Sequence, residues 1–209
     1  MLRSMNVRRY CSLYVLLCTV CALASGLPAA TPVVPGDRDR QVLETLLLHL
    51  LADPTFDMTR VSTNGATIVL HTRTPEKTGF IQSHQMRIDI GDHTLPSDVE
   101  RDLQRRNSKP GTYDAIEASF ADLKFAPGIV VADLTDKRAG RRASRAFEET
   151  HPKARGWLEA YLPGYSKDGS RAVVRGGTGP SAHGAMVTAL LEQSGDKWVV
   201  KWHFLAWYA

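Results

Sequence analysis

The chain has 209 residues, 43% of them hydrophobic and 23% charged, which is the composition of an ordinary globular protein. Its formal net charge is +4, but Arg3, Arg8 and Arg9 lie in a segment expected to be removed, and without these three the net charge is +1. So small a charge gives no indication of nucleic-acid binding, and no nucleic-acid partner is expected.

The first predicted element is a signal peptide at residues 1–24. The three arginines precede an apolar run, Leu13–Ala24, which ends in a small-x-small cleavage site. The run is too short to span a bilayer, so we expect export to the periplasm or the medium, with no transmembrane span in the mature chain. A lipid anchor on Cys21 is the alternative. All three cysteines lie in this segment, so the mature chain is expected to contain no disulfide.

A single folded domain is predicted to follow. Residues 25–36 are rich in Pro and Ala and indicate a tether, which leaves residues 37–209 for the domain. The domain begins with a predicted helix at 37–52, ended by Asp53-Pro54. Its apolar residues recur at helical spacing and predict one buried stripe that packs on a sheet. The stripe comprises Val42, Leu43, Leu46, Leu47, Leu50 and Leu51.

The middle of the chain alternates between predicted strands and helices. Gln85–Ile90 is typical of a strand, because Met86, Ile88 and Ile90 alternate with the charged Arg87 and Asp89. The other predicted elements are strands at 66–72 and around 129–131, and helices at 98–107 and from 143 to about 149.

Four antiparallel strands are predicted at the C-terminal end, at 157–163, 171–175, 184–193 and 198–208. Asp168-Gly169 marks the first turn and a Gly-rich loop at 176–181 the second. In the last strand the even positions, from Trp198 to Tyr208, are apolar and are expected on one buried face. The predicted fold is therefore α+β: an antiparallel meander sheet of four C-terminal strands, with up to three earlier strands, and helices on one side.

The sequence contains no complete catalytic motif. Gly179–Gly184 has one residue too many for a nucleophile elbow, and the Gly-rich loop lacks the Lys of a phosphate loop. His183 is the candidate general base, with Ser181 or Asp168 beside it. The histidines are dispersed along the chain. The one local cluster of metal-ligand residues is His84, Asp89, Asp92 and His93, and strand alternation would place His84 and Asp89 on opposite faces. No metal site and no cofactor are therefore expected.

A basic run suggests one partner. Five basic residues in nine form it: Lys137, Arg138, Arg141, Arg142 and Arg145. The run could contact an anionic envelope polymer, or it could be a solvated face.

The segment from Leu95 to Trp202 resembles a known family. The pattern Pro-Gly-Tyr-Ser-x-Asp-Gly, then Ser-x-His-Gly, then Trp, resembles a family of uncharacterised exported bacterial proteins of planctomycete type. It is similar more distantly to small exported proteins in which Tyr165-Ser166 and His183-Gly184 would fall on matching positions. Those proteins have paired cysteines near the Gly-rich loop, where this chain has none.

The resemblance implies export and an α+β domain, and it brings no activity. It makes Tyr165, Ser166 and His183 the candidate binding residues. We therefore expect an exported non-catalytic domain that binds a ligand or is structural in the cell envelope. The alternative is a small envelope hydrolase that uses His183 with Ser181 or Asp168.

Overall fold

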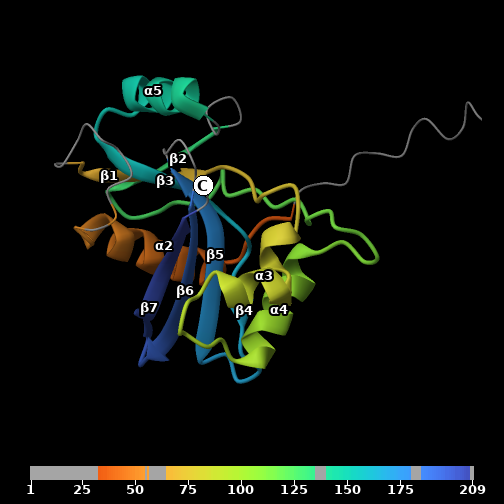
Figure 1. Cartoon of the computed structure of the whole chain (residues 1–209). Coiled ribbons are helices and arrows are strands. Elements are labelled where there is room, and N and C mark those ends of the chain that lie inside the picture. Colours follow the sequence, from red (N-terminus) through yellow and green to blue (C-terminus); the bar gives the residue numbers. More distant parts are fainter. Residues whose placement is uncertain (1–32, 55, 57–64, 135–139, 180–184, 208–209) are drawn as a thin grey trace, which may run out of the picture. The chain divides into compact units, whose positions relative to one another are not determined.

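The computed structural model describes residues 33–54, 56, 65–134, 140–179 and 185–207 (Figure 1). The helices are α2 (Asp37–Ala52), the 3-10 helix η2 (Gly79–Ile81), α3 (Ser83–Ile88), α4 (Ser97–Asn107) and α5 (Gly140–Thr150). The strands are β1 (Thr67–His71), β2 (Ile129–Ala132), β3 (Ala154–Ala160), β4 (Gly164–Tyr165), β5 (Arg171–Gly179), β6 (Ala185–Ser194) and β7 (Lys197–Trp207). The predicted signal peptide, Ser181 and His183 lie outside the described residues. No helix in the described ranges is long and apolar enough to cross a membrane.

The strands form one mixed sheet in the order β2-β1-β3-β5-β6-β7, with β4 beside β5. The C-terminal strands β5, β6 and β7 pair antiparallel, as predicted. The α+β class is confirmed, but a wholly antiparallel sheet is wrong, because β1 runs parallel to both β2 and β3. Strands β2 and β3 flank β1 and run in the same direction. Successive parallel strands need a crossover connection, and the one between β2 and β3 contains α5.

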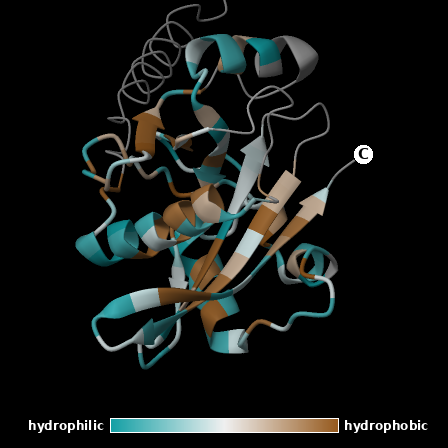
Figure 2. Cartoon of the chain, turned by 90° about the vertical axis from the view of Figure 1, so that its left-hand side faces the viewer, coloured by the Kyte–Doolittle hydropathy of each residue, from teal (hydrophilic) through white to brown (hydrophobic). Residues whose placement is uncertain are grey.

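One face of the sheet is covered by α2, as its apolar stripe predicts. Leu43, Leu46 and Leu50 are fully buried against residues of β1, β5 and β6 in the largest core cluster. Burial of each such side chain is worth about 1.5–3 kcal/mol. Figure 2 shows hydrophobic residues, in brown, along the strands, whereas the helices carry both colours. The stripe therefore anchors α2 on the sheet.

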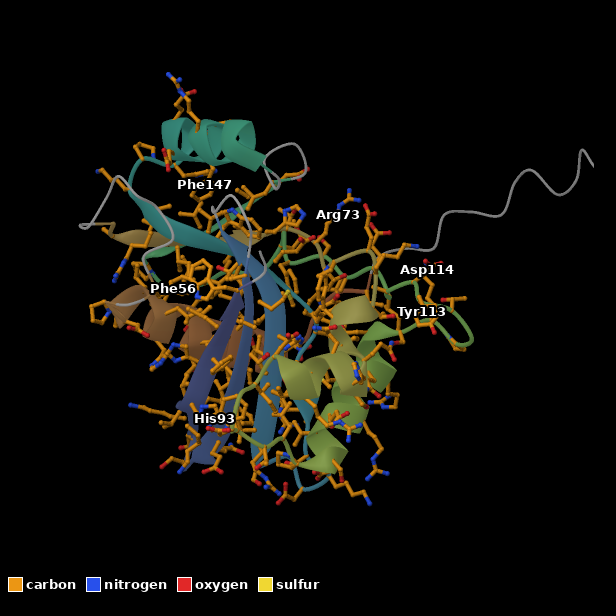
Figure 3. The ribbon with its side chains drawn as sticks, in the orientation of Figure 1. Phe56, Arg73, His93, Tyr113, Asp114 and Phe147 are labelled. Carbon is orange, nitrogen blue, oxygen red and sulfur yellow. The ribbon has the colours of Figure 1, made fainter. Side chains whose placement is uncertain are left out.

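Helices also cover the other face of the sheet, so the prediction that they lie on one side is wrong. Met86 of α3 and Leu103 of α4 pack on Val173 of β5 in a second cluster. Phe147 of α5 packs against Trp157 of β3 in a third, beneath the helix in Figure 3. Figure 1 shows α2 on one side of β5–β7 and α3 and α4 on the other. The sheet is therefore the middle layer of three.

The strand predicted at Gln85–Ile90 is a helix, α3, followed by a turn. Met86, Asp89 and Ile90 are buried together, which is the i, i+3, i+4 spacing of a helical face. Asp89 is buried because its carboxylate pairs with the guanidinium of Arg175 on β5. The alternating pattern predicts a strand only if Asp89 faces solvent, whereas it lies in the interior.

The loop predicted at 176–181 is, as far as Gly179, the second half of β5. Gly176 pairs with β3 on one side and β6 on the other. A Cβ there would lie 2.5 Å from the carbonyl oxygen of Glu159, and one at Gly179 would lie 2.7 Å from the Trp157 ring. These glycines allow close approach between neighbouring strands rather than a turn.

Strand β7 contains one residue more than its partner β6. Leu190 pairs with Trp202, but Leu191 pairs with Val200, so Lys201 is the extra residue of a β-bulge. Because side chains alternate between faces with a period of two, one extra residue exchanges the two faces beyond it.

The single buried face predicted for the even positions of β7 is therefore wrong. Val200, before the bulge, packs against the α2 core, and beyond it Leu205 does so. His203 also reaches α2, where its ring meets His49. Trp202 and Phe204 lie on the opposite face, beside His93.

Candidate functional site

A groove of ≈ 480 Å³ lies where α2, α4 and the turn between β4 and β5 meet. It includes Tyr165 and Ser166, two of the candidate binding residues. The lining residues are Arg38, Asp98, Arg101, Asp102, Arg105, Arg106, Tyr165, Ser166 and Lys167.

The floor of the groove is a hydrogen-bonded network around Asp39, the third residue of α2. The Tyr165 hydroxyl donates to Asp39 Oδ1 at 2.8 Å, and Arg106 donates to both carboxylate oxygens at 2.8 and 3.0 Å. Burial, and then the neighbouring Asp39 carboxylate, raise the pKa of Tyr165 well above its usual value. The phenol therefore stays a protonated donor, and the bidentate Arg106 pair holds the floor rigid.

Arg38 closes one side of the groove. Its guanidinium carbon lies 4.0 Å from the centre of the Tyr165 ring and 5.5 Å from that of Trp198. It also donates a hydrogen bond to the carbonyl oxygen of Gly169. A cation over aromatic rings is attracted by their quadrupoles, which holds Arg38 in place.

The rim carries cations that point to solvent. Arg101 donates from its Nε to Ser97 O at 3.0 Å, and its terminal amino groups have no partner among the described residues. Arg105 pairs with Asp102 at 2.6 Å while its side chain stays 73% exposed. Lys167 is exposed, and its ammonium has no partner in the described ranges.

The two carboxylates of the lining are already engaged by the backbone of the β4 segment. Asp102 Oδ2 accepts from the Tyr165 N–H at 2.9 Å, and Asp98 Oδ2 accepts from the Lys167 N–H at 3.2 Å. Five cationic residues line the groove, against these two carboxylates and that of Asp39 in the floor. The formal charge of the groove is therefore +2, which favours an anionic ligand.

Asp168, a candidate for the hydrolase alternative, stabilises the turn beside the groove. Its carboxylate accepts from the hydroxyl of Ser166 at 2.6 Å and from the N–H and hydroxyl of Ser170 at 3.0 and 2.9 Å. These bonds lower the pKa of Asp168 to about 2. A carboxylate of that pKa is a weak general base near neutral pH. Its partners Ser181 and His183 lie outside the described residues, so the hydrolase alternative stays a prediction.

The arginines of the groove escaped sequence analysis, although a signal for them exists. Arg101 and Arg105 are four residues apart and so lie on one face of α4. Asp39 comes from another helix, 67 residues away from Arg106. Nothing local in the sequence indicates that the two segments meet.

Two other predicted groups are only partly described. Within the basic run, the described side chain is that of Arg145, which is exposed and pairs with Glu149 at 3.0 Å. A polymer contact through this run stays a prediction. In the 84–93 segment, Asp89 faces Arg175 and His93 stacks on Trp202.

Comparison with protein-family models, with curated proteins and with solved structures finds no match to this chain. The resemblance to exported bacterial proteins therefore stays a prediction.

Proposed function

We propose that this is an exported, non-catalytic binding domain of the cell envelope, and that the groove at Tyr165 takes an anionic ligand. The observation that carries the proposal is the exposed set Arg101, Arg105 and Lys167 above a rigid floor. Guanidinium groups are suited to phosphate, sulfate and carboxylate oxygens, which they bind in pairs. Arg101 can do so without breaking an existing ion pair.

Binding, rather than chemistry, is supported by the kinds of residue in the lining. Among the residues that the structure describes, the lining contains no imidazole and no thiol. The pKa of Tyr165 is raised by burial, so its phenol does not titrate near neutral pH. A general acid–base catalyst needs a group whose pKa lies near the working pH.

The experiment is calorimetric titration of the protein with inorganic phosphate, sulfate and citrate at low and high salt. The variant carries Arg101→Ala and Arg105→Ala, and we expect it to weaken binding about tenfold or more, the equivalent of about 1.4 kcal/mol. Binding should also weaken as salt screens the rim.

Arg87→Ala is the matched control. Arg87 is an exposed residue of α3 whose Nε donates to a carbonyl four residues earlier, as that of Arg101 does on α4. The control should bind as the unchanged protein does. Absence of anion binding in the unchanged protein, or equal loss in Arg87→Ala, would contradict the proposal.

A further inference from the structure

A second groove, of ≈ 510 Å³, lies between the end of α2 and the bulge of β7, and it is rich in imidazole. Figure 3 shows His93 beside the lower end of β7. The lining residues are His49, Ala52, Asp53, Pro54, His93, Val200, Lys201, Trp202 and His203.

Two of these histidines face each other across the groove. His49 Nε2 lies 3.1 Å from His203 Nδ1, and His203 Nε2 lies 3.0 Å from Asp53 Oδ2. A carboxylate oxygen can only accept a hydrogen bond, so the Asp53 carboxylate holds the proton of the neutral His203 ring on Nε2. The lone pair of His203 Nδ1 is therefore directed at His49.

We propose that His49 Nε2 and His203 Nδ1 together chelate a divalent transition metal ion of the kind that prefers imidazole: zinc, copper or nickel. Two nitrogens about 2.0–2.1 Å from one ion lie about 3.3–3.4 Å apart in tetrahedral geometry. In square-planar geometry they lie about 2.8–3.0 Å apart. The separation of 3.1 Å falls between these values, and each ring would turn so that its lone pair points at the ion rather than at the other nitrogen.

The surroundings meet the other requirements of a metal site. In many metal sites a carboxylate accepts a hydrogen bond from the histidine ring nitrogen that does not bind the metal, which fixes the tautomer and orients the ring. Asp53 is placed to do this for His203. His49 is exposed, so its ring can turn and its proton can move to Nδ1. Lys201, a cation of the lining, pairs with Glu192 at 3.2 Å, which offsets its charge. His93 is stacked on Trp202, with ring centres 4.5 Å apart, and is not a ligand here.

The site offers two protein nitrogens, and water completes the coordination. No group of three or more His, Cys, Asp or Glu side chains in the described ranges is arranged to hold a metal ion. We therefore expect reversible binding, weaker than that of a structural zinc site. His49 and His203 are 154 residues apart, and nothing local in the sequence indicates that they meet.

The test is calorimetric titration of the folded protein with zinc chloride and with nickel chloride. We expect one ion per chain, and a rise in melting temperature that a chelator reverses, because the metal binds the folded state. His49→Ala, at an exposed helix position that Ala suits, should abolish binding without unfolding the protein. His84→Ala, an exposed histidine of α3, should leave binding unchanged.

Asp53→Asn separates a metal site from simple surface adsorption. Loss of an outer carboxylate weakens metal affinity by about 10- to 100-fold, so binding should persist but be weaker by that factor. The proposal is overturned if the unchanged protein shows no saturable binding up to about 1 mM metal. It is also overturned if His49→Ala binds as tightly as the unchanged protein.

Discussion

The buried ion pair between Asp89 and Arg175 gives the sharpest test of the fold. The Arg175 side chain is 0% exposed and that of Asp89 is 4% exposed. Asp89→Asn keeps the shape but removes the carboxylate charge that faces the guanidinium. Breaking a buried pair from one side costs about 3–5 kcal/mol, because the remaining charge stays out of water. For a domain of this size that lowers the melting temperature by about 6–20 °C.

The assay is urea unfolding followed by tryptophan fluorescence, with Asp114→Asn as the control. Asp114 makes the same kind of contact with Lys77, but on the surface, as its position in Figure 3 shows, and its loss should barely move the midpoint. The double variant Asp89→Leu with Arg175→Met should regain most of the lost stability. A cost below about 1 kcal/mol for Asp89→Asn, or a double variant less stable than the single one, would refute the argument.

Two further predictions concern β5 and β7. Gly176→Ala should lower the free energy of unfolding in urea by about 1–3 kcal/mol, because the new Cβ would meet the backbone of β3. Gly177→Ala is the control and should cost less, because its Cβ would meet only Met186 Sδ, at 3.9 Å. Equal losses in the two variants would contradict the pairing. The folded state lowers the pKa of His203, so the unfolded state binds more protons and stability should fall as pH drops through about 6.5. His203→Gln should flatten the melting-temperature profile between about pH 7 and pH 5, and an unchanged slope would contradict this.

Sequence reasoning succeeded where a pattern is local and regular. The helix predicted at 37–52 has those bounds, and its apolar stripe lies on the buried face, with Leu48 the exposed exception. The turn predicted at Asp168-Gly169 precedes β5 as expected, with Gly169 at φ +78°, although β4 before it was not predicted. The parallel pairing of β1 has no such signal, since a crossover leaves no local mark.

Sequence reasoning failed where a residue type has two physical uses. Asp89 is charged and so indicates a solvent face, but here it neutralises a buried arginine. Gly176 indicates a loop, but here it makes room for a neighbouring strand. In the candidate site, resemblance points to Tyr165 and Ser166, whereas Asp39 and Arg101 become relevant only when α2 and α4 are brought together.

The bulge at Lys201 also protects the outer edge of the sheet. Strand β7 ends the strand order, and at eleven residues it is long enough to template another chain. A bulge interrupts the regular row of backbone donors and acceptors, and the exposed Lys197 opposes a second copy by like-charge repulsion. Folded chains that carry such an edge resist edge-to-edge aggregation.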